Sequence, residues 1–338
     1  MHVAVDGRAL RPGAARARGV ARYLHCLLEE LRRAFPEDSY TLVDPGRARL
    51  AASALTGRPC LDRLAPACDV AWVPTPAPVA VSSRTPYVLT VHDLSFEHRP
   101  ADYSAYERLW HRLARPASLA RGAARLVCVS EATRRDAIES WGIDAERAHT
   151  ILSGPGRPPA PGALPAFMPE SFVLAVGALE PRKLPRLLAA AHRSARADGL
   201  GAELVFAGDG PLRGELEEGG ATVLGHVPDA LLDAVYERAL AVACVSREEG
   251  FGFTPLEALA RGTPAIVADL PVFRETLGEG ALRVPSGDAG ALAAALVRIE
   301  REPALRERLV EAGRAAVGRL SWERAARETR ALLAEAAR

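Results

Sequence analysis

The sequence predicts an α/β protein built from two doubly wound domains, and three observations carry this prediction. Short apolar runs alternate with longer helix-forming segments, which is the pattern of parallel strands joined by helical crossovers. The 338 residues are too many for one ordinary domain and suit two of about 150 to 170 residues. A Pro- and Gly-rich stretch divides the apolar runs into two sets. We therefore expect an N-terminal domain over residues 1–152, a linker over 153–169, a C-terminal domain over 170–320 and a last helix over 321–338.

The overall composition indicates a small-molecule partner and no nucleic acid. The formal net charge of +1, with both signs mixed, lacks the sustained positive charge of a nucleic-acid or membrane-coating surface. Five cysteines are widely spaced and show no metal-ligand spacing, so we expect reduced core residues in a cytoplasmic protein. No apolar run reaches about 18 residues, and the N-terminus predicts a strand instead of a signal peptide. Membrane contact is expected only as peripheral contact at the inner face.

The first half is expected to contain parallel strands over residues 2–5, 40–43, 70–73, 87–91 and 126–129. A helix is expected from Gly19 onward, because apolar residues there recur at spacings of three and four. Ser130 is the predicted N-cap of a helix over residues 131–141, and Gly142 is its predicted stop.

Polar residues follow the predicted strand over residues 87–91, at the end of a parallel strand where such sheets bind ligands. His92 is therefore the candidate ligand-contacting residue of the first half. A packed histidine beside a helix-capping Asp93 is the alternative interpretation. We expect His98 to lie in a loop.

The second half is expected to contain strands over residues 172–176, 204–207, 222–224, 241–245 and 265–267. Helices are predicted over 187–191 and 256–260, and further helices within 288–316 close the domain. Asp209 and Asp229 follow two of these strands in glycine-containing turns, and we expect them to cap the next helices.

A glycine turn and two cations begin the second half. Gly177 follows the first strand, and Arg182 and Lys183 come just before a helix, which is the pattern of a diphosphate site. Lys183 is the single lysine of an Arg-rich chain that contains no Asn and no Gln. We interpret its retention as a need for a compact ammonium in a confined place, and chance survival is the alternative.

The stretch from residue 245 to residue 257 combines a strand end, a tight loop and a helix start. Gly250 and Gly252 allow the backbone to approach a ligand closely, and the free N–H groups of a helix beginning near Thr254 attract anions. Glu249 and Glu257 bracket the loop too far apart to act as one close pair, so we expect them to hold different parts of an extended ligand. Two alternatives stay open: a capping box from Thr254 to Glu257, and a solvated loop position for Glu249.

The run from Glu249 to Pro264 resembles the signature of the retaining glycosyltransferases of family four, which have the GT-B fold. This resemblance implies two Rossmann-like domains that face each other across a cleft. It also implies that Glu249 holds hydroxyls of the donor sugar and that Glu257 holds the ribose of the nucleotide. The backbone groups that the resemblance places against the donor belong to Gly177, Gly250, Phe251, Gly252, Phe253 and Thr254.

The same resemblance assigns roles outside this run. Arg182 and Lys183 match the residues that neutralise the leaving diphosphate, although Leu184 stands where the family usually has Asn, which costs a helix cap. His92 resembles the histidine that reaches the donor sugar. On the acceptor side, Gly19 and Arg22 line the cleft together with Asp93. The turns at Asp209 and Asp229 resemble those around the nucleotide base, and the last helix is expected to return to the first domain.

The implied activity is transfer of a hexose from a nucleoside diphosphate sugar to an acceptor hydroxyl, with retention at the anomeric carbon. No metal and no further cofactor are expected, and the sequence contains no Asp-x-Asp pair at a strand end. The resemblance extends to bacterial mannosyltransferases of surface polysaccharide assembly, which favours GDP-mannose. UDP-glucose and a deoxyhexose donor stay open as alternatives, and so does the oligomeric state.

The acceptor is expected to be a sugar or a lipid-linked molecule. A basic loop is a candidate site for an anionic acceptor or an ordinary basic surface, and its arginines are Arg8, Arg11, Arg16 and Arg18. A binding protein that senses nucleotide sugars without transfer is the alternative from another class. A GT-B epimerase or phosphorylase is the alternative among enzymes.

Overall fold

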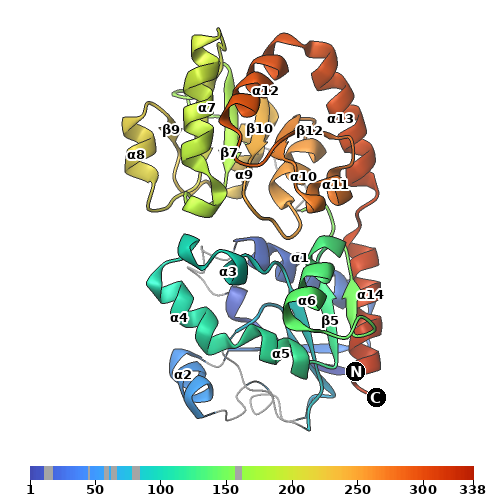
Figure 1. Cartoon of the computed structure of the whole chain (residues 1–338). Helices are drawn as coiled ribbons and strands as arrows, with labels where there is room; N and C mark the ends of the chain where they lie inside the picture. The colour runs from blue at the N-terminus through green and yellow to red at the C-terminus, as the bar shows by residue number, and fades with distance from the viewer. Residues whose placement is uncertain (11–17, 45, 57–60, 62–66, 78–83, 157–161) are drawn as a thin grey trace. The chain divides into compact units, whose positions relative to one another are not determined.

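The computed structural model describes residues 1–10, 18–44, 46–56, 61, 67–77, 84–156 and 162–338. It divides into two compact units, which we describe separately. The first comprises Met1–Gly154 and Leu320–Arg338, and the second comprises Pro155–Arg319 (Figure 1). Each unit contains one parallel sheet with helices, so the predicted α/β class with two doubly wound domains is confirmed.

The sheet of the first unit has the strand order β2-β1-β3-β4-β5-β6. Its strands are β1 (His2–Asp6), β2 (Ser39–Val43), β3 (Val70–Val73), β4 (Tyr87–Val91), β5 (Arg125–Cys128) and β6 (Ala148–Thr150). The direction of strand addition reverses between β1 and β3, so their carboxyl ends flank a crevice position of the doubly wound type. The edge strand β6 was not predicted, because only Ala148 of its residues is buried and no apolar run marks it.

The helices of the first unit are α1 (Arg18–Ala34), α2 (Gly46–Thr56), α3 (Ser95–His98), α4 (Ala105–Ala114), α5 (Pro116–Gly122), α6 (Glu131–Trp141) and α14 (Trp322–Ala336). The predicted cap of α6 is confirmed, because Ser130 Oγ accepts a hydrogen bond from the Thr133 amide at 3.1 Å and Gly142 has a φ of 64°. The prediction of a loop at His98 is wrong, because this residue ends α3.

The last helix, α14, belongs to the first unit although it follows the second in sequence. Ser321 caps it, and it packs against α1 and against β3, β4 and β5 (Figure 1). Arg330 donates to Asp38 at 2.9 Å, and the same carboxylate pairs with the N-terminal ammonium at 2.9 Å. The C-terminal segment therefore fastens the beginning of the chain as well as covering the sheet.

The sheet of the second unit has the order β12-β11-β10-β7-β8-β9. Its strands are β7 (Phe172–Val176), β8 (Glu203–Ala207), β9 (Thr222–Val223), β10 (Ala241–Cys244), β11 (Ala265–Ala268) and β12 (Ala281–Val284). Strand β12 was not predicted, because Arg283 interrupts its apolar run at the edge of the sheet. The direction of strand addition reverses between β7 and β10, which makes their carboxyl ends the expected ligand position.

The helices of the second unit are α7 (Pro185–Ala197), α8 (Arg213–Glu218), α9 (Asp229–Arg238), α10 (Phe253–Ala260), α11 (Pro271–Leu277), α12 (Ala289–Arg301) and α13 (Pro303–Gly318). Helices α7 and α12 pack against each other, and α13 packs against α10 and α11 (Figure 1). From the predicted linker, residues 157–161 lie outside the described part, while Leu164 and Met168 pack against the core of this unit.

The predicted capping roles of Asp209 and Asp229 are wrong. Helix α8 begins only at Arg213, and Asp209 instead accepts a hydrogen bond from the amide of Gly210 at 2.8 Å. Helix α9 begins at Asp229 itself, after Pro228, and has no side-chain cap. Each aspartate therefore misses the cap position through the local turn geometry.

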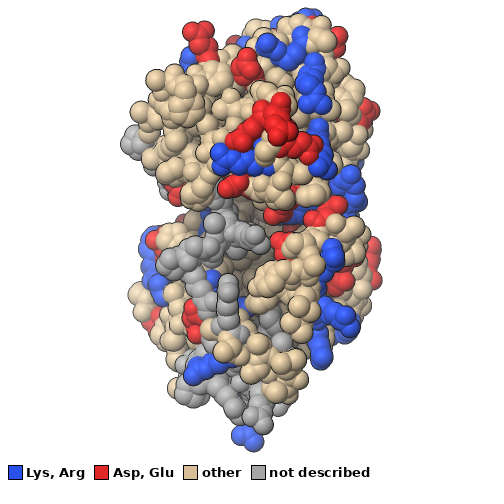
Figure 2. All heavy atoms as spheres, turned by 90° about the vertical axis from the view of Figure 1, so that its left-hand side faces the viewer, with Lys and Arg blue, Asp and Glu red and all other residues tan. Residues whose placement is uncertain are grey.

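The surface carries both signs of charge. Acidic and basic side chains lie among each other on the face that Figure 2 presents, in keeping with the net charge of +1. Within the described residues, no helix is both long and apolar enough to cross a bilayer.

Candidate functional site

The candidate site of the second unit lies where β7 and β10 end. Gly177 follows β7 with a φ of 137°, a backbone conformation that side chains rarely allow, and Ser246 lies just beyond β10. A small cavity of about 30 Å³ lies between these strand ends, and its lining includes Gly177, Lys183, Ser246 and Glu249. The chain therefore brings its predicted glycine turn, its single lysine and one of the two predicted glutamates to the switch point of the sheet.

Lys183 and Glu249 form an ion pair at the centre of this site. The Lys183 Nζ atom lies 2.5 Å from Glu249 Oε1, and the Ser246 hydroxyl donates to the same oxygen at 2.8 Å. The lysine side chain is 24% exposed and the carboxylate 15%, so the solvated-loop alternative for Glu249 is wrong. Among the described residues, every contact of this carboxylate falls on Oε1, which leaves Oε2 as an acceptor for a ligand.

The environment of Glu249 keeps it ionised. Burial alone raises the pKa of this carboxyl, but the charge and hydrogen bond of Lys183, followed by Arg182 and Ser246, outweigh burial and lower the pKa below its usual value. Cys244, which approaches Oε1 at 3.8 Å, responds in the opposite direction: burial and the nearby carboxylate raise the pKa of its thiol to about 12. The site is therefore a fixed negative charge beside a fixed ammonium.

Arg182 stands beside this pair on the short 3-10 turn Pro181–Lys183. Its guanidinium pairs with Glu180 at 3.0 Å, and its carbonyl accepts from the Arg247 amide at 3.1 Å. Leu184 then adopts a left-handed conformation with a φ of 53°, and α7 begins at Pro185 without a side-chain cap. The predicted loss of a helix cap at Leu184 is confirmed.

Helix α10 begins at Phe253, one residue before the predicted start at Thr254, with Gly252 at its N-cap. Gly252 has a φ of 88°, and a Cβ atom there would lie 2.6 Å from Cε1 of the buried Phe273, so only glycine fits. Gly250 and Phe251 are buried in the loop, and the Phe251 ring packs edge-on to Phe253 at 4.9 Å. The loop thus presents backbone N–H groups at the start of a rigidly placed helix.

The capping-box alternative for Glu257 is wrong, because Thr254 and Glu257 both lie inside α10 and no side chain caps that helix. Glu257 is instead buried, with 3% of its surface exposed, and its Oε2 accepts a hydrogen bond from the Tyr236 hydroxyl at 3.1 Å. Sequence analysis missed Tyr236, since only the packing of α9 beside α10 reveals its contact. Ser246 was also missed, although its place directly after an apolar strand was a usable signal.

In the first unit, His92 lies at the end of β4 and is held by neighbours. Its Nε2 donates to the Pro74 carbonyl at 2.8 Å, and its ring meets Tyr23 edge-on at 4.9 Å. Burial lowers the pKa of His92, so the ring is neutral near pH 7. Asp93 accepts from the Ser95 amide at 3.0 Å and starts α3, as the packing alternative expected. Among the described residues, the Nδ1 atom of His92 makes no hydrogen bond.

The remaining residues predicted on the acceptor side lie near the start of α1. Gly19 is exposed, and Arg22 is half-buried one turn along the helix. Arg8 is paired with the buried Asp6, and its Nε donates to that carboxylate at 2.7 Å. Arg11 and Arg16 lie outside the described residues.

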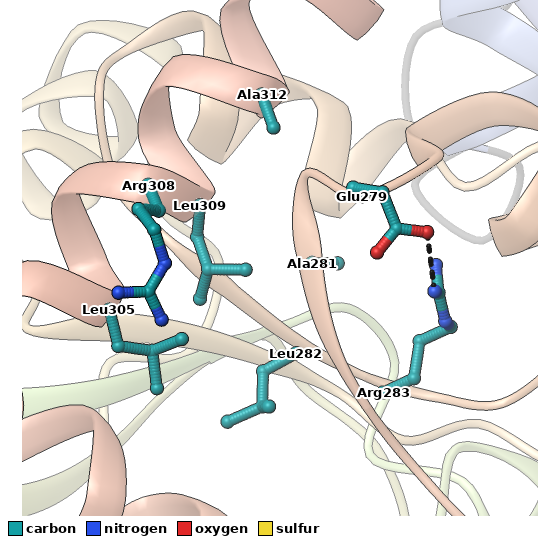
Figure 3. Close-up of a pocket in the computed structure, with 8 residues that line it drawn as sticks. All are labelled: Glu279, Ala281, Leu282, Arg283, Leu305, Arg308, Leu309 and Ala312. Carbon is teal, nitrogen blue, oxygen red and sulfur yellow. Dashed lines mark hydrogen bonds and ion pairs between the residues drawn. The ribbon is translucent and has the colours of Figure 1, made fainter.

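A larger hollow of about 480 Å³ lies elsewhere in the second unit, between β12 and α13 (Figure 3). Figure 3 shows Leu305 and Leu309 on one side of it and Leu282 on the other, with Arg283 paired to Glu279 at 2.8 Å. Its charges lie at the rim and its walls are aliphatic, so it offers no group suited to a reaction. We therefore place the chemistry in the smaller cavity, where charges and glycine backbone converge.

The described residues include no group of three or more His, Cys, Asp or Glu side chains arranged to hold a metal ion. Cationic groups in the second unit are available instead at Arg182 and Lys183, next to the N-terminus of α10.

Two family models match the chain, one to each half. The model described as Glycosyltransferase Family 4 matches residues 17–154, and the model described as Glycosyl transferases group 1 matches residues 160–316. The two matches together span most of the chain.

Curated relatives include several mannosyltransferases. The O-antigen chain mannosyltransferase B of Escherichia coli is 27% identical over 266 residues, which cover 72% of this chain and 68% of that protein. The phosphatidyl-myo-inositol mannosyltransferase of Mycobacterium leprae is 45% identical over 103 residues, which cover 29% of this chain and 27% of the relative. The O-antigen chain mannosyltransferase RfbU of Salmonella typhimurium is 43% identical over 82 residues, 24% of this chain and 23% of the relative. The chain thus spans about a quarter of the length of the last two relatives.

Solved structures share the fold at low sequence identity. Anabaena Alr3699/HepE in complex with UDP and glucose has a TM-score of 0.70 at 17% identity, covering 99% of this chain and 100% of that one. Sucrose-phosphate synthase from Thermosynechococcus elongatus has a TM-score of 0.66 at 20% identity, covering 89% and 84%. The two doubly wound sheets are therefore those of the GT-B class of glycosyltransferases. Within that class, the chain belongs to glycosyltransferase family 4.

Proposed function

We propose that this protein transfers a hexose from a nucleoside diphosphate sugar to an acceptor hydroxyl, with retention at the anomeric carbon. The observation that carries the proposal is the Lys183–Glu249 pair at the switch point of the second sheet, beside the glycine-capped start of α10. This arrangement supplies both positive charge for a leaving diphosphate and a fixed acceptor for sugar hydroxyls. The family match supports the same reaction.

The proposed roles follow from the chemistry of each group. Lys183, Arg182 and the first N–H groups of α10 stabilise the negative charge that develops on the diphosphate as it leaves. Because Glu249 is held at Oε1, its Oε2 orients the donor sugar through a hydroxyl. Glu257 holds the ribose. The leaving phosphate oxygen takes the acceptor proton on the same face, so no side chain acts as a nucleophile.

His92 is proposed to contact the donor sugar, because its neutral ring leaves Nδ1 as a hydrogen-bond acceptor. Gly19, Arg22 and Asp93 are proposed to lie on the acceptor side. The proposal needs no metal or other cofactor, since the cations and the helix N-terminus already meet the charge of the diphosphate.

The proposed donor is GDP-mannose, and the names of the curated relatives support mannose. UDP-glucose is the main alternative, because a structure of the same fold was solved with UDP-glucose bound. A thermal-shift panel of GDP, UDP, dTDP and ADP would separate these donors, since a ligand that binds only the folded state raises the melting temperature. We expect the largest rise with GDP.

The proposed acceptor is a sugar or lipid-linked molecule in polysaccharide or glycolipid assembly, with peripheral membrane contact. Helix α4 supports such contact, because its Tyr106 and Leu109 side chains are 62% and 54% exposed. Arg108, Arg112 and Arg115 are exposed on the same segment, and such a combination of apolar and basic side chains suits an anionic lipid surface.

The direct test is loss of transfer in two variants. Lys183→Ala and Glu249→Ala should each lower kcat/KM at least about 100-fold without loss of the fold, because each removes a preorganised charge. Arg186→Ala is the matched control, since it removes a nearby but exposed ion pair with Glu215 and should stay within about twofold of the parent protein. Transfer that survives both site variants would overturn the proposal. Nucleotide binding without release of nucleoside diphosphate would indicate a sensor instead.

A further inference from the structure

The Tyr236 hydroxyl contacts one of the two glutamates of the candidate site. Tyr236 is 1% exposed on α9 and donates to Glu257 Oε2 at 3.1 Å. A carboxylate buried among apolar groups is costly unless it accepts hydrogen bonds, and a phenol supplies one. The same bond limits rotation of the carboxyl group about its last torsion angle.

The tyrosine is itself fixed by its surroundings. The guanidinium of Arg261 lies over its ring, 5.4 Å from the centroid, and the Thr263 hydroxyl donates to its carbonyl at 2.7 Å. Arg261 is buried with Asp233 in an ion pair and also donates to the Glu257 carbonyl at 3.0 Å. The phenol and the carboxylate are therefore tied to the same buried cation, so their mutual placement does not depend on flexible surface groups.

A glycine confines the carboxylate from another side. Gly156 has a φ of 94°, and a Cβ atom there would lie 2.7 Å from Glu257 Oε1 and 2.9 Å from its Cγ. The backbone thus approaches Oε1 as closely as a residue without a side chain allows. A carboxylate has about four lone-pair sites, and the phenol hydrogen occupies one on Oε2, so capacity for ligand hydroxyls is retained.

We propose that Tyr236 is a positioning residue that orients Glu257 toward the vicinal hydroxyls of the nucleotide ribose. This inference rests on the proposed function, because it takes a nucleoside diphosphate as the ligand. A residue that only supports the fold would affect all nucleotides alike. A positioning residue affects only those that carry the hydroxyls.

The test compares GDP with 2′,3′-dideoxy-GDP by calorimetry, with UDP and its dideoxy counterpart as a second pair. Tyr236→Phe keeps the ring under Arg261 and removes only the hydroxyl. It should weaken binding of the ribonucleotide about tenfold, the size of a lost hydrogen bond to a charged group. Binding of the dideoxy nucleotide should change less than twofold. In turnover, the donor KM should rise while kcat stays within about twofold, because the ribose lies away from the bond that breaks.

A second variant and two controls complete the experiment. Gly156→Ala displaces the carboxylate from its other side and should show the same dependence on the ribose hydroxyls. Tyr87→Phe is the matched control, because it removes a buried phenol that donates to the Leu119 carbonyl at 2.6 Å in the first unit. In a Glu257→Ala background, Tyr236→Phe should add no further loss.

The inference is overturned if Tyr236→Phe binds both nucleotides like the parent protein. Equal weakening with both nucleotides also overturns it, because that result indicates a purely structural role. Failure of the proposed function gives a different result, in which the parent protein itself binds no nucleoside diphosphate and transfers no sugar.

Discussion

The two units build the same kind of sheet but place different chemistry at its carboxyl edge. In the second unit, Lys183 and Glu249 meet as charges, and the pKa of the carboxyl is lowered. In the first unit, the corresponding edge carries His92 packed against Tyr23, and burial keeps the imidazole neutral. One fold thus supports a charged site in one place and a neutral, aromatic site in another. The difference lies in the few residues that follow the strands.

The largest expected effect tests why the second unit retains its lysine. Lys183→Arg should lower kcat about 100-fold, although the charge is kept, because the ammonium is confined 2.5 Å from Glu249 and a guanidinium needs more room. The measurement is steady-state transfer, with Arg186→Lys as the control. Parent-like turnover of Lys183→Arg would show that the lysine survived by chance.

The next effect contrasts a glycine from each unit. Gly252→Ala should destabilise the second unit by about 2 kcal/mol or more, because the residue is left-handed and its methyl would meet the buried Phe273. Gly19→Ala in α1 meets nothing within 4 Å and should be neutral or stabilising by up to about 1 kcal/mol. Urea unfolding followed by hydrogen exchange in each unit measures both changes. Similar losses for the two variants would contradict the contrast.

A smaller effect is expected at the neutral site. His92→Gln should lower kcat about tenfold, which corresponds to one neutral hydrogen bond of about 1.4 kcal/mol, with the donor KM nearly unchanged. His111→Gln is the control, because burial also lowers the pKa of His111 but it packs on Phe96, away from the strand end. A loss of 100-fold or more would instead assign His92 a part as large as that of Lys183.

The smallest effect separates the units by pH. Burial lowers the pKa values of His92, His111 and His149 below 6.5, so their contribution to stability is complete above pH 6.5 and is lost as the pH falls through the folded values. The lowered pKa of Glu249 places the matching loss in the second unit below about pH 4.5. The first unit should therefore weaken first on acidification.

Tryptophan fluorescence can follow that difference, because all four tryptophans belong to the first unit. Between pH 6.5 and 5, the fluorescence midpoint in urea should fall while hydrogen exchange in β7 and β10 stays protected. Simultaneous loss in both units would contradict the assignment.

Sequence predicted the features that depend on local pattern. Buried strands such as β3 and β7 have continuous apolar runs, and the cap at Ser130 follows from its own three-residue neighbourhood. The edge strands β6 and β12 escaped prediction because half of each strand faces away from the core.

The candidate site shows the same limit. Gly177, Lys183 and Glu249 could be brought together in advance, because each adjoins the end of a parallel strand. The contact between Tyr236 and Glu257 could not, because it joins two helices whose packing has no signal in either segment. The capping-box pattern from Thr254 to Glu257 was misleading, since a left-handed Gly252 starts α10 two residues earlier.

The most direct test of the central claim is a crystal structure of the protein with a nucleoside diphosphate bound. We predict the terminal phosphate within hydrogen-bonding distance of Lys183 Nζ and of the first backbone N–H groups of α10, with the ribose at Glu257. A diphosphate bound anywhere else, for instance in the hollow between β12 and α13, would contradict the account.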